Sequence, residues 1–175
     1  MNFLGLSGSL RAVSTNSALL LAMRDCAPDG CRLEIYDGLG KLPIFNPDDE
    51  QTPTAEVLRL ADLVGRSDGI VIACPEYAHG VPGGLKNALD WLVSGEAAVG
   101  KPAMLVHASP RSLTSRTALR EILNTMSFDV FAGDEFEIAL LGKKPEDVEA
   151  MLAATEARRC MQEMLVGFQR FASRH

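Results

Sequence analysis

The chain is poor in aromatic residues, and its cysteines do not form a pattern typical of metal sites. Phe, Trp and Tyr together make up 6% of the 175 residues, with one Trp and two Tyr. The four cysteines include no C-x-x-C pair and have no matching histidine cluster, which argues against zinc and leaves no metal expected. Thiols without evident pairing fit a reducing, cytoplasmic setting. They are Cys26, Cys31, Cys74 and Cys160.

Long apolar runs and an excess of positive charge are also missing. No apolar stretch approaches the roughly 20 residues that span a bilayer, and the first residues lack the basic and apolar blocks of a secretory signal. The formal net charge of −6 disfavours nonspecific binding to nucleic acid or to an anionic membrane. We therefore expect a small molecule, not a nucleic acid or a membrane, as the partner.

The sequence does contain a regular alternation of strand-like and helix-like segments. The run at residues 69–74 is continuously apolar, as in a parallel strand that is covered on both faces. Five strands alternating with five helices indicate a single α/β domain over residues 1–175, built on a doubly wound parallel sheet. The strands are expected near residues 2–6, 32–36, 69–74, 103–107 and 128–131, and the helices near 17–25, 54–64, 82–93, 119–126 and 145–171.

The loops that follow the expected strands are the predicted location of the site. In a doubly wound sheet, ligands bind beyond the carboxyl ends of the strands. The loops after the first, third and fourth strands, at residues 7–14, 75–84 and 108–112, should therefore share one site. The segment at 38–53 is rich in Gly, Pro and Asp and has the length of a binding loop or lid.

The stretch between the first strand and the first helix, residues 8–17, predicts a phosphate site. The start of a helix offers unpaired N–H groups and the positive end of the helix dipole, which together bind anions. A guanidinium can hold two phosphate oxygens at once, and hydroxyl and amide groups add donors. The polar side chains of this stretch are Ser9, Arg11, Ser14, Asn16 and Ser17.

A plainer interpretation of the same stretch is an ordinary helix start, with Ser14 as its N-cap and Arg11 in solvent. The stretch matches neither the dinucleotide fingerprint G-x-G-x-x-G nor the Walker A loop. Any phosphate bound here would therefore be held without a metal and without a P-loop lysine.

A second motif, at residues 75–91, makes the chain resemble a known family. It reads P-E-Y-x-x-x-x-P-G-x-L-K-N-A-x-D-W, and residues 8–16 read G-S-L-R-x-x-S-x-N. Together they are similar to the NADPH-dependent FMN reductase family of flavodoxin-like proteins, which includes quinone, azo-dye and chromate reductases. Residues 42–48 also resemble that family's loop after the second strand, and the similarity is clear over residues 1–107.

The resemblance implies a flavodoxin-like fold and an enzyme that passes electrons from NADPH or NADH through bound FMN to an acceptor. The acceptor would be a quinone, an azo compound, a metal oxyanion or free flavin. Because the cofactor supplies the chemistry, no catalytic acid or nucleophile is expected. Relatives commonly assemble as homodimers or homotetramers. The implied FMN contacts are Ser9, Leu10, Arg11, Ser14, Asn16 and Ser17 from the first motif, and Pro75, Glu76, Tyr77, Ala78, Gly80 and Ser109 beside the ring.

Two positions depart from the family's pattern. Ala78 stands where many relatives have Asn, and the third loop reads Ser109-Pro110-Arg111-Ser112 where relatives often carry glycines. We expect the charge of Arg111, if it lies near the pyrimidine edge of the flavin, to favour the anionic reduced form.

Polar residues of the helix after the second motif have simpler explanations than catalysis. Lys86, Asn87 and Asp90 are expected to pair with each other or to solvate the helix, and Trp91 to lie in the core or in a subunit interface, not against the flavin.

Four further residues are read in the same way. His79 is expected in solvent, with proton donation to a reduced quinone as the alternative. Cys74 is expected as a buried strand-end thiol, with a redox role as the alternative. Arg116 and Arg120 are expected in solvent, with binding of the 2′-phosphate of NADPH as the alternative.

Two functions of other kinds remain open at this point. One is a flavodoxin-like electron carrier without nicotinamide activity, although such carriers usually cover the ring with aromatic side chains and these loops show only Tyr77. The other is a phosphate-binding hydrolase or transferase without flavin.

Overall fold

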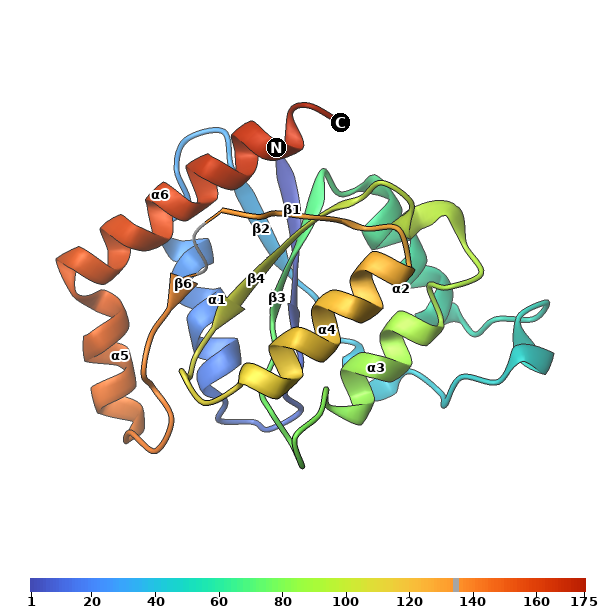
Figure 1. The fold of residues 1–175 in the computed structure, drawn as a ribbon, viewed down its shortest axis with the longest axis horizontal. Helices are drawn as coiled ribbons and strands as arrows, with labels where there is room; N and C mark the ends of the chain where they lie inside the picture. Colours follow the sequence, from blue (N-terminus) through green and yellow to red (C-terminus); the bar gives the residue numbers. More distant parts are fainter. Residues whose placement is uncertain (134–135) are drawn as a thin grey trace.

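The computed structural model describes residues 1–133 and 136–175 as a central parallel sheet covered by helices (Figure 1). The strand order is β2-β1-β3-β4-β5, and β6 also pairs with β4. Every one of these pairings is parallel, so the expected flavodoxin-like, doubly wound sheet is confirmed. The strands are β1 (Asn2–Ser7), β2 (Arg32–Ile35), β3 (Gly69–Ala73), β4 (Pro102–His107), β5 (Asp129–Val130) and β6 (Phe136–Glu137).

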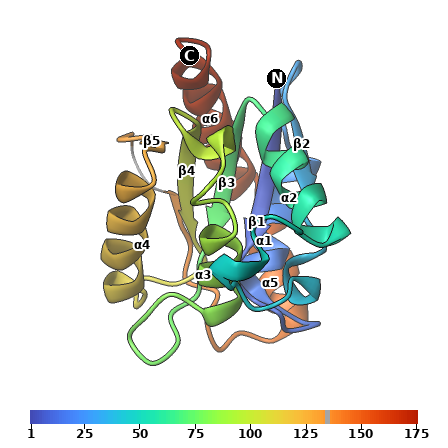
Figure 2. The ribbon, with the colours of Figure 1, turned by 90° about the vertical axis from the view of Figure 1, so that its right-hand side faces the viewer.

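Helices connect the strands and form a layer on each face of the sheet. The α-helices are α1 (Thr15–Asp25), α2 (Ala55–Arg66), α3 (Gly83–Asp90), α4 (Leu113–Thr125), α5 (Pro145–Ala153) and α6 (Thr155–Ala172). Short 3-10 turns are η1 (Leu39–Lys41), η2 (Pro47–Asp49) and η3 (Glu96–Ala98). Figure 2 looks at the sheet from the side of α2 and α3, with α1 and α5 behind it.

Two hydrophobic cores lie on opposite faces of the sheet because neighbouring strand residues point to opposite sides. One core joins Ile70 and Ile72 of β3 to residues of α2, α3 and α4. The other joins Val71 and Ala73 of the same strand to residues of α1, α5 and α6. All five residues of β3 are buried, as the continuous apolar run predicts.

The expected single helix over residues 145–171 is wrong, and the described residues form six α-helices where five helices were expected. Ala154 is extended, with φ −57° and ψ 139°, and separates α5 from α6. The two helices run in different directions in Figure 1. Because α5 packs on α1 whereas α6 also packs against β4 and β6, one straight helix could not satisfy both. No glycine or proline marks the break.

The fifth strand expected at residues 128–131 is present as β5, and β6 adds a second short piece that pairs with β4 outside the predicted range. Asp129 of β5 pairs with Pro102 at the start of β4, and Phe136 of β6 pairs with Val106 near its end. The second piece was not predicted, because two residues are too few to give an alternating pattern.

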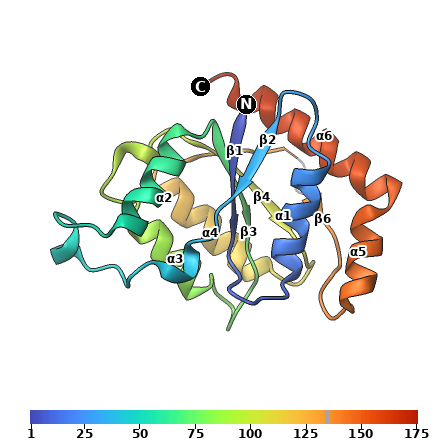
Figure 3. The same ribbon diagram turned by 180° about the vertical axis from the view of Figure 1, so that it is seen from behind.

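The carboxyl ends of β1, β3 and β4 lie together at the lower end of the sheet in Figure 1. The segment that carries η2 projects sideways from the rest of the molecule, as Figure 3 shows from behind. In the part of the chain that the structure describes, no helix is both long and apolar enough to cross a membrane.

Candidate functional site

The hydroxyl-rich loop after β1 leads directly into α1. Ser14 is the N-cap, and its Oγ accepts a hydrogen bond from the Ser17 backbone N at 3.3 Å. The Ser17 hydroxyl lies 2.8 Å from that of Ser7, so it is engaged within the loop. The first turn of α1 has no acidic residue. The capping interpretation is thus confirmed, and the other N–H groups of the first turn remain oriented to receive an anion.

The loop after β3 ends in a tight turn with an unusual backbone. Tyr77 and Gly80 exchange two backbone hydrogen bonds, of 3.2 and 3.0 Å. The two residues between them, Ala78 and His79, both have positive φ, 49° and 57°. Turns with two positive φ values normally contain Asn and Gly. The Tyr77 hydroxyl lies 3.4 Å from Ser9 Oγ, which brings this loop against the loop after β1.

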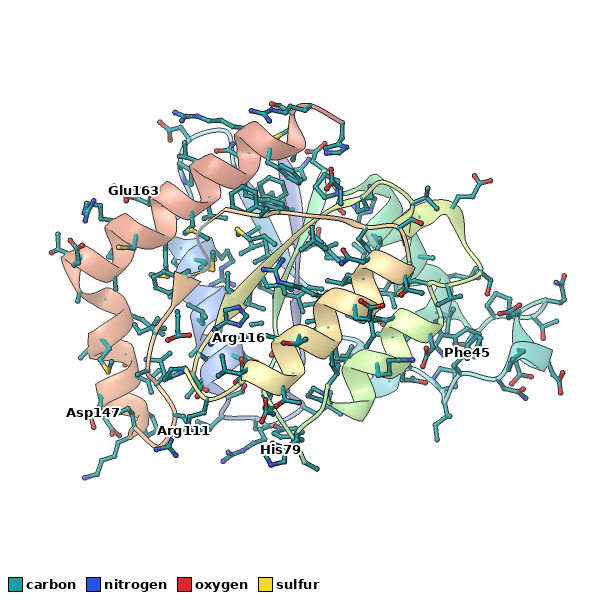
Figure 4. All side chains as sticks on the ribbon, viewed as in Figure 1. Phe45, His79, Arg111, Arg116, Asp147 and Glu163 are labelled. Atoms are coloured by element: carbon teal, nitrogen blue, oxygen red, sulfur yellow. The ribbon has the colours of Figure 1, made fainter. Side chains whose placement is uncertain are left out.

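The side chain of Glu76 connects the same loop to α4. Its Oε2 accepts a hydrogen bond from the Ser115 backbone N at 3.0 Å. Its Oε1 lies 3.2 Å from His79 Nδ1, and the His79 side chain is 86% exposed. The solvent position expected for His79 is therefore confirmed, and Figure 4 shows it at the lower edge of the molecule.

The loop after β4 is held by one buried guanidinium. Arg116 Nη2 donates to the Ser109 carbonyl oxygen at 2.6 Å and lies 2.6 Å from Glu137 Oε2. Ser109 Oγ in turn accepts a hydrogen bond from the Arg111 backbone N at 3.1 Å. The Arg116 side chain is only 12% exposed, so the expectation that it is solvated is wrong. Its sequence position off the apolar face of α4 does not reveal that Glu137 covers it.

These three loops enclose a pocket of about 980 Å³. Leu10 lines a separate hollow of about 410 Å³ together with Tyr77 and Pro82. Ser17, Ala78 and Gly80 line neither of these pockets. The other predicted site residues do line the large pocket, and they are Ser9, Arg11, Ser14, Asn16, Pro75, Glu76, Tyr77 and Ser109.

The far wall of the pocket was not predicted. It consists of the segment before α5, the apolar face of α5 and the first turn of α6, which stand opposite α1. No local signal in residues 141–158 indicates this position, because it depends on how α5 packs against α1. The residues of this wall include Leu141, Lys143, Val148, Leu152 and Arg158.

Charged groups of both signs line the pocket. The cations are Arg11, Arg111, Lys143 and Arg158, and the acidic groups are Asp25, Glu76 and Glu149. In a chain with a formal net charge of −6, four cations against three acidic groups make this pocket locally favourable to an anionic ligand.

Two buried groups close to the loops are uncharged at neutral pH. Burial raises the pKa of the Cys74 thiol to about 12. Burial, followed by the neighbouring charge of Arg116, lowers the pKa of His107 to about 4. The Cys74 thiol therefore fits the structural interpretation better than the redox one. Within residues 1–133 and 136–175, no group of three or more His, Cys, Asp and Glu side chains is placed to hold a metal ion.

Asn87 and Trp91 hold the long loop that follows β2. The Asn87 amide donates to the Pro43 carbonyl at 2.8 Å and accepts from the Phe45 backbone N at 2.7 Å. Trp91 Nε1 donates to the same Pro43 oxygen at 2.8 Å, and its ring meets Phe45 edge-on. Trp91 is therefore a core residue, as expected. Asn87 was expected to pair or to solvate its helix, and in the structure it also anchors the loop after β2 through Pro43 and Phe45.

Lys86 and Asp90, on the same helix, form an ion pair with each other. This is the simple pairing that the sequence predicts, with both side chains partly exposed.

Comparison with known proteins identifies the family of this chain. The family model described as NADPH-dependent FMN reductase matches residues 1–140. The chain belongs to this family. The match extends beyond residues 1–107, where the motifs carry the resemblance, and includes the loop after β4, α4 and both pieces of the fifth strand.

Several relatives of this family member are similar over most of its length. The "NADH:(hydroxy)cinnamate reductase subunit CrdA" of Vibrio ruber is 39% identical over 150 residues, 82% of this chain and 72% of that protein. The "NAD(P)H-dependent FMN reductase PA1204" of Pseudomonas aeruginosa is 32% identical and covers 98% and 95% of the two chains. The solved structure of the flavoenzyme FerB of Paracoccus denitrificans has the same fold, with a TM-score of 0.84 and 24% identity, and the match covers 99% of this chain and 98% of FerB.

The pocket fits the family's cofactor in size and in chemistry. Its volume of about 980 Å³ lies at the upper end of the range for small-molecule sites. The open start of α1 supplies donors for a phosphate. A Cβ at Gly8 would come within 3.0 Å of Pro75 Cδ, so the loops after β1 and β3 pack closely around one site. Ser9, Arg11 and Asn16 line the pocket beside this helix start.

Proposed function

We propose that FMN binds in this pocket and that the protein uses it to pass electrons from NADPH or NADH to a small acceptor. The observation that carries this proposal is the convergence of three loops and the start of α1 on one pocket. The acceptor class is that of the family: a quinone, an azo compound, a metal oxyanion or free flavin. The whole chain, residues 1–175, would act as one FMN-binding unit.

Different groups of residues that line the pocket suit the two ends of FMN. Ser9, Arg11, Ser14 and Asn16 would surround the phosphate, where the helix dipole and the guanidinium offset its charge. The segment 75–77 and Ser109 would line the ring, largely through the backbone. FMN, when bound, supplies reversible two-electron chemistry, while the protein orients it and controls access to it.

An enzyme is favoured over an electron carrier because the ring would be left open. Tyr77 is the one aromatic residue that lines the pocket within the described part of the chain, and its residue surface is 48% exposed. Carriers usually cover the flavin with aromatic side chains, whereas an open face admits first the nicotinamide and then the acceptor. The His79 side chain, 86% exposed at the nearby turn, leaves this face accessible.

An anaerobic visible spectrum of the FMN-reconstituted protein tests the proposal. We expect yellow absorbance that persists through desalting and bleaches within seconds of adding NADPH or NADH, and the faster donor identifies the preference. Retained flavin that is not bleached would indicate an electron carrier. A protein that retains no flavin would contradict the proposal and favour a different phosphate ligand.

We infer further that the protein assembles as a homodimer or homotetramer in the cytoplasm. The apolar side chains of Val93, Val99 and Leu113 are exposed, and contact with another subunit would remove them from water. The four free thiols support a reducing compartment. Light scattering coupled to size-exclusion chromatography measures the oligomeric state, and a monomeric mass would contradict the inferred assembly.

A further inference from the structure

Arg116 is a largely buried cation that contacts the loop after β4. Its side chain is 12% exposed, although it is the fourth residue of α4 in a chain with many exposed arginines. One nitrogen, Nη2, serves two acceptors, the Ser109 carbonyl and the Glu137 carboxylate, each at 2.6 Å. Figure 4 shows Arg116 deeper in the molecule than Arg111. A buried charge is tolerated only when it is paired in this way.

The Ser109 contact fixes the loop after β4. This loop has only five residues between the end of β4 at His107 and the start of α4 at Leu113. Within it, Ser109 is held at its carbonyl by Arg116 and at its hydroxyl by the Arg111 backbone N. Ser109 is 8% exposed, so the loop residue beside the proposed ring position is fixed from two sides.

The neighbouring residue of α4 holds the other loop beside the proposed ring. Ser115 N donates to Glu76, which follows β3. The N-cap of α4, Ser112, forms no side-chain capping bond of its own, so Glu76 supplies that acceptor from a different loop. Two adjacent residues of α4 therefore hold the loops after β3 and after β4.

Glu137 extends this connection to the edge of the sheet. It belongs to β6, the second piece of the fifth strand, and pairs in register with His107 at the end of β4. Its carboxylate is 38% exposed and closes over the guanidinium. The position of Ser109 thus depends on α4 and on β6 together.

We propose that Arg116 is a positioning residue of the flavin site, with Glu137 as its counter-charge. Arg116 holds the Ser109 carbonyl of the loop after β4 to the first turn of α4, and Glu76 of the loop after β3 caps that same turn. Arg116 thereby sets the distance between these two loops. Arg116 does not line the pocket, so it acts through Ser109 and not by contact with the ring. This inference rests on the proposed function, because it assumes that FMN occupies the pocket.

The test compares Arg116→Gln with Arg59→Gln. Arg59 is the control because it is likewise held by two acceptors, here the carboxylates of Asp37 and Glu56, but lies on α2 and does not line the pocket. We expect apo Arg116→Gln to bind FMN at least ten-fold more weakly in a fluorescence titration, and its segment 108–112 to exchange amide hydrogens faster. Arg59→Gln should keep its FMN affinity within about two-fold, whatever its stability.

Two further variants keep the test decisive. Arg116→Lys, which keeps the charge but not the planar fork, should have an FMN affinity between those of Arg116→Gln and the wild type. Glu137→Gln should weaken FMN binding several-fold, and less than additively in combination with Arg116→Gln. If Arg116→Gln does not fold, Glu137→Gln decides the question.

Failure of the inference can be told from failure of the proposed function. A wild-type protein that binds no FMN would overturn both. A wild type that binds FMN, together with Arg116→Gln or Glu137→Gln variants that bind it equally well, would overturn the role of Arg116 and leave the proposed function standing.

Discussion

At the scale of single residues, Arg11 is the side chain whose charge should matter most for a phosphate. It is exposed and lines the pocket beside the start of α1. A hydrogen bond that involves a charge contributes about 1.5–3 kcal/mol. Arg11→Ala should therefore weaken FMN binding roughly ten- to hundred-fold in a titration of the apoprotein. Arg66→Ala, which removes an equally exposed arginine of α2, is the control, and equal affinities for all three proteins would contradict the assignment.

Ala78 occupies a backbone region that L-residues avoid. Its φ of 49° costs about 1–2 kcal/mol that glycine does not incur, and the greater freedom of glycine in the unfolded chain offsets part of this. Ala78→Gly should therefore raise the free energy of unfolding of the apoprotein by about 0.5–1 kcal/mol, measured with urea. Ala139→Gly, at an exposed loop position without positive φ, should lower it. A loss of stability in both variants would show that the turn is not strained.

The raised pKa of Cys74 predicts how its thiol reacts. Alkylation requires the thiolate, and with a pKa of about 12 only on the order of 10⁻⁴ of the Cys74 thiol is ionised at pH 8. We expect iodoacetamide to modify the partly exposed Cys160 first and to leave Cys74 unmodified until urea is added. Peptide mass spectrometry over time gives the order. Modification of Cys74 in the native protein at the rate of Cys160 would contradict its burial.

At the scale of elements, α3 is the support of the long loop after β2. Asn87→Ala would remove two hydrogen bonds and leave the partly buried Phe45 N–H without its acceptor, a cost of about 1–3 kcal/mol. We expect faster proteolysis within residues 38–53 and a lower free energy of unfolding. Trp91→Phe, which removes one donor to Pro43, should have a smaller effect. Lys86→Ala, which breaks an exposed ion pair on the same helix, should change neither quantity measurably.

Elements with a strong local signal could be predicted from the sequence. The apolar run of β3 and the alternation of strands with helices predicted a parallel sheet, and the flanking motifs predicted the three loops of the site. The break at Ala154 and the strand β6 could not be predicted, because neither has a turn residue or a pattern of its own. Both are determined by packing against elements that are distant in the sequence.

The same distinction applies to the residues of the site. The serines before α1 and the segment 75–77 were predicted because a helix start and a family motif can both be recognised from the local sequence. The position of Arg116 and the wall formed by α5 depend on contacts between α4 and β6 and between α1 and α5. The periodicity of α4 alone predicted that Arg116 is solvated. A helical pattern contains no information about Glu137, which β6 places over the Arg116 side chain.

At the scale of the whole molecule, ligand binding should appear as stability. A ligand that binds only the folded state at 100 times its Kd adds about 2.7 kcal/mol. For a chain of 175 residues this corresponds to a rise in Tm of roughly 5–10 °C with FMN. Riboflavin, which has the same ring without the phosphate, should raise Tm much less. Equal shifts with the two compounds would show that the start of α1 does not hold the phosphate.

The division of the fifth strand into two short pieces has a consequence for how the protein behaves in a crowded solution. A long, straight edge strand presents a row of free backbone donors and acceptors on which another chain can add a strand. Here β5 and β6 have two residues each, and at the opposite edge the four residues of β2 include the exposed Arg32 and Glu34. Neither edge offers a template long enough for edge-to-edge aggregation, so the parallel sheet is protected against it at both ends.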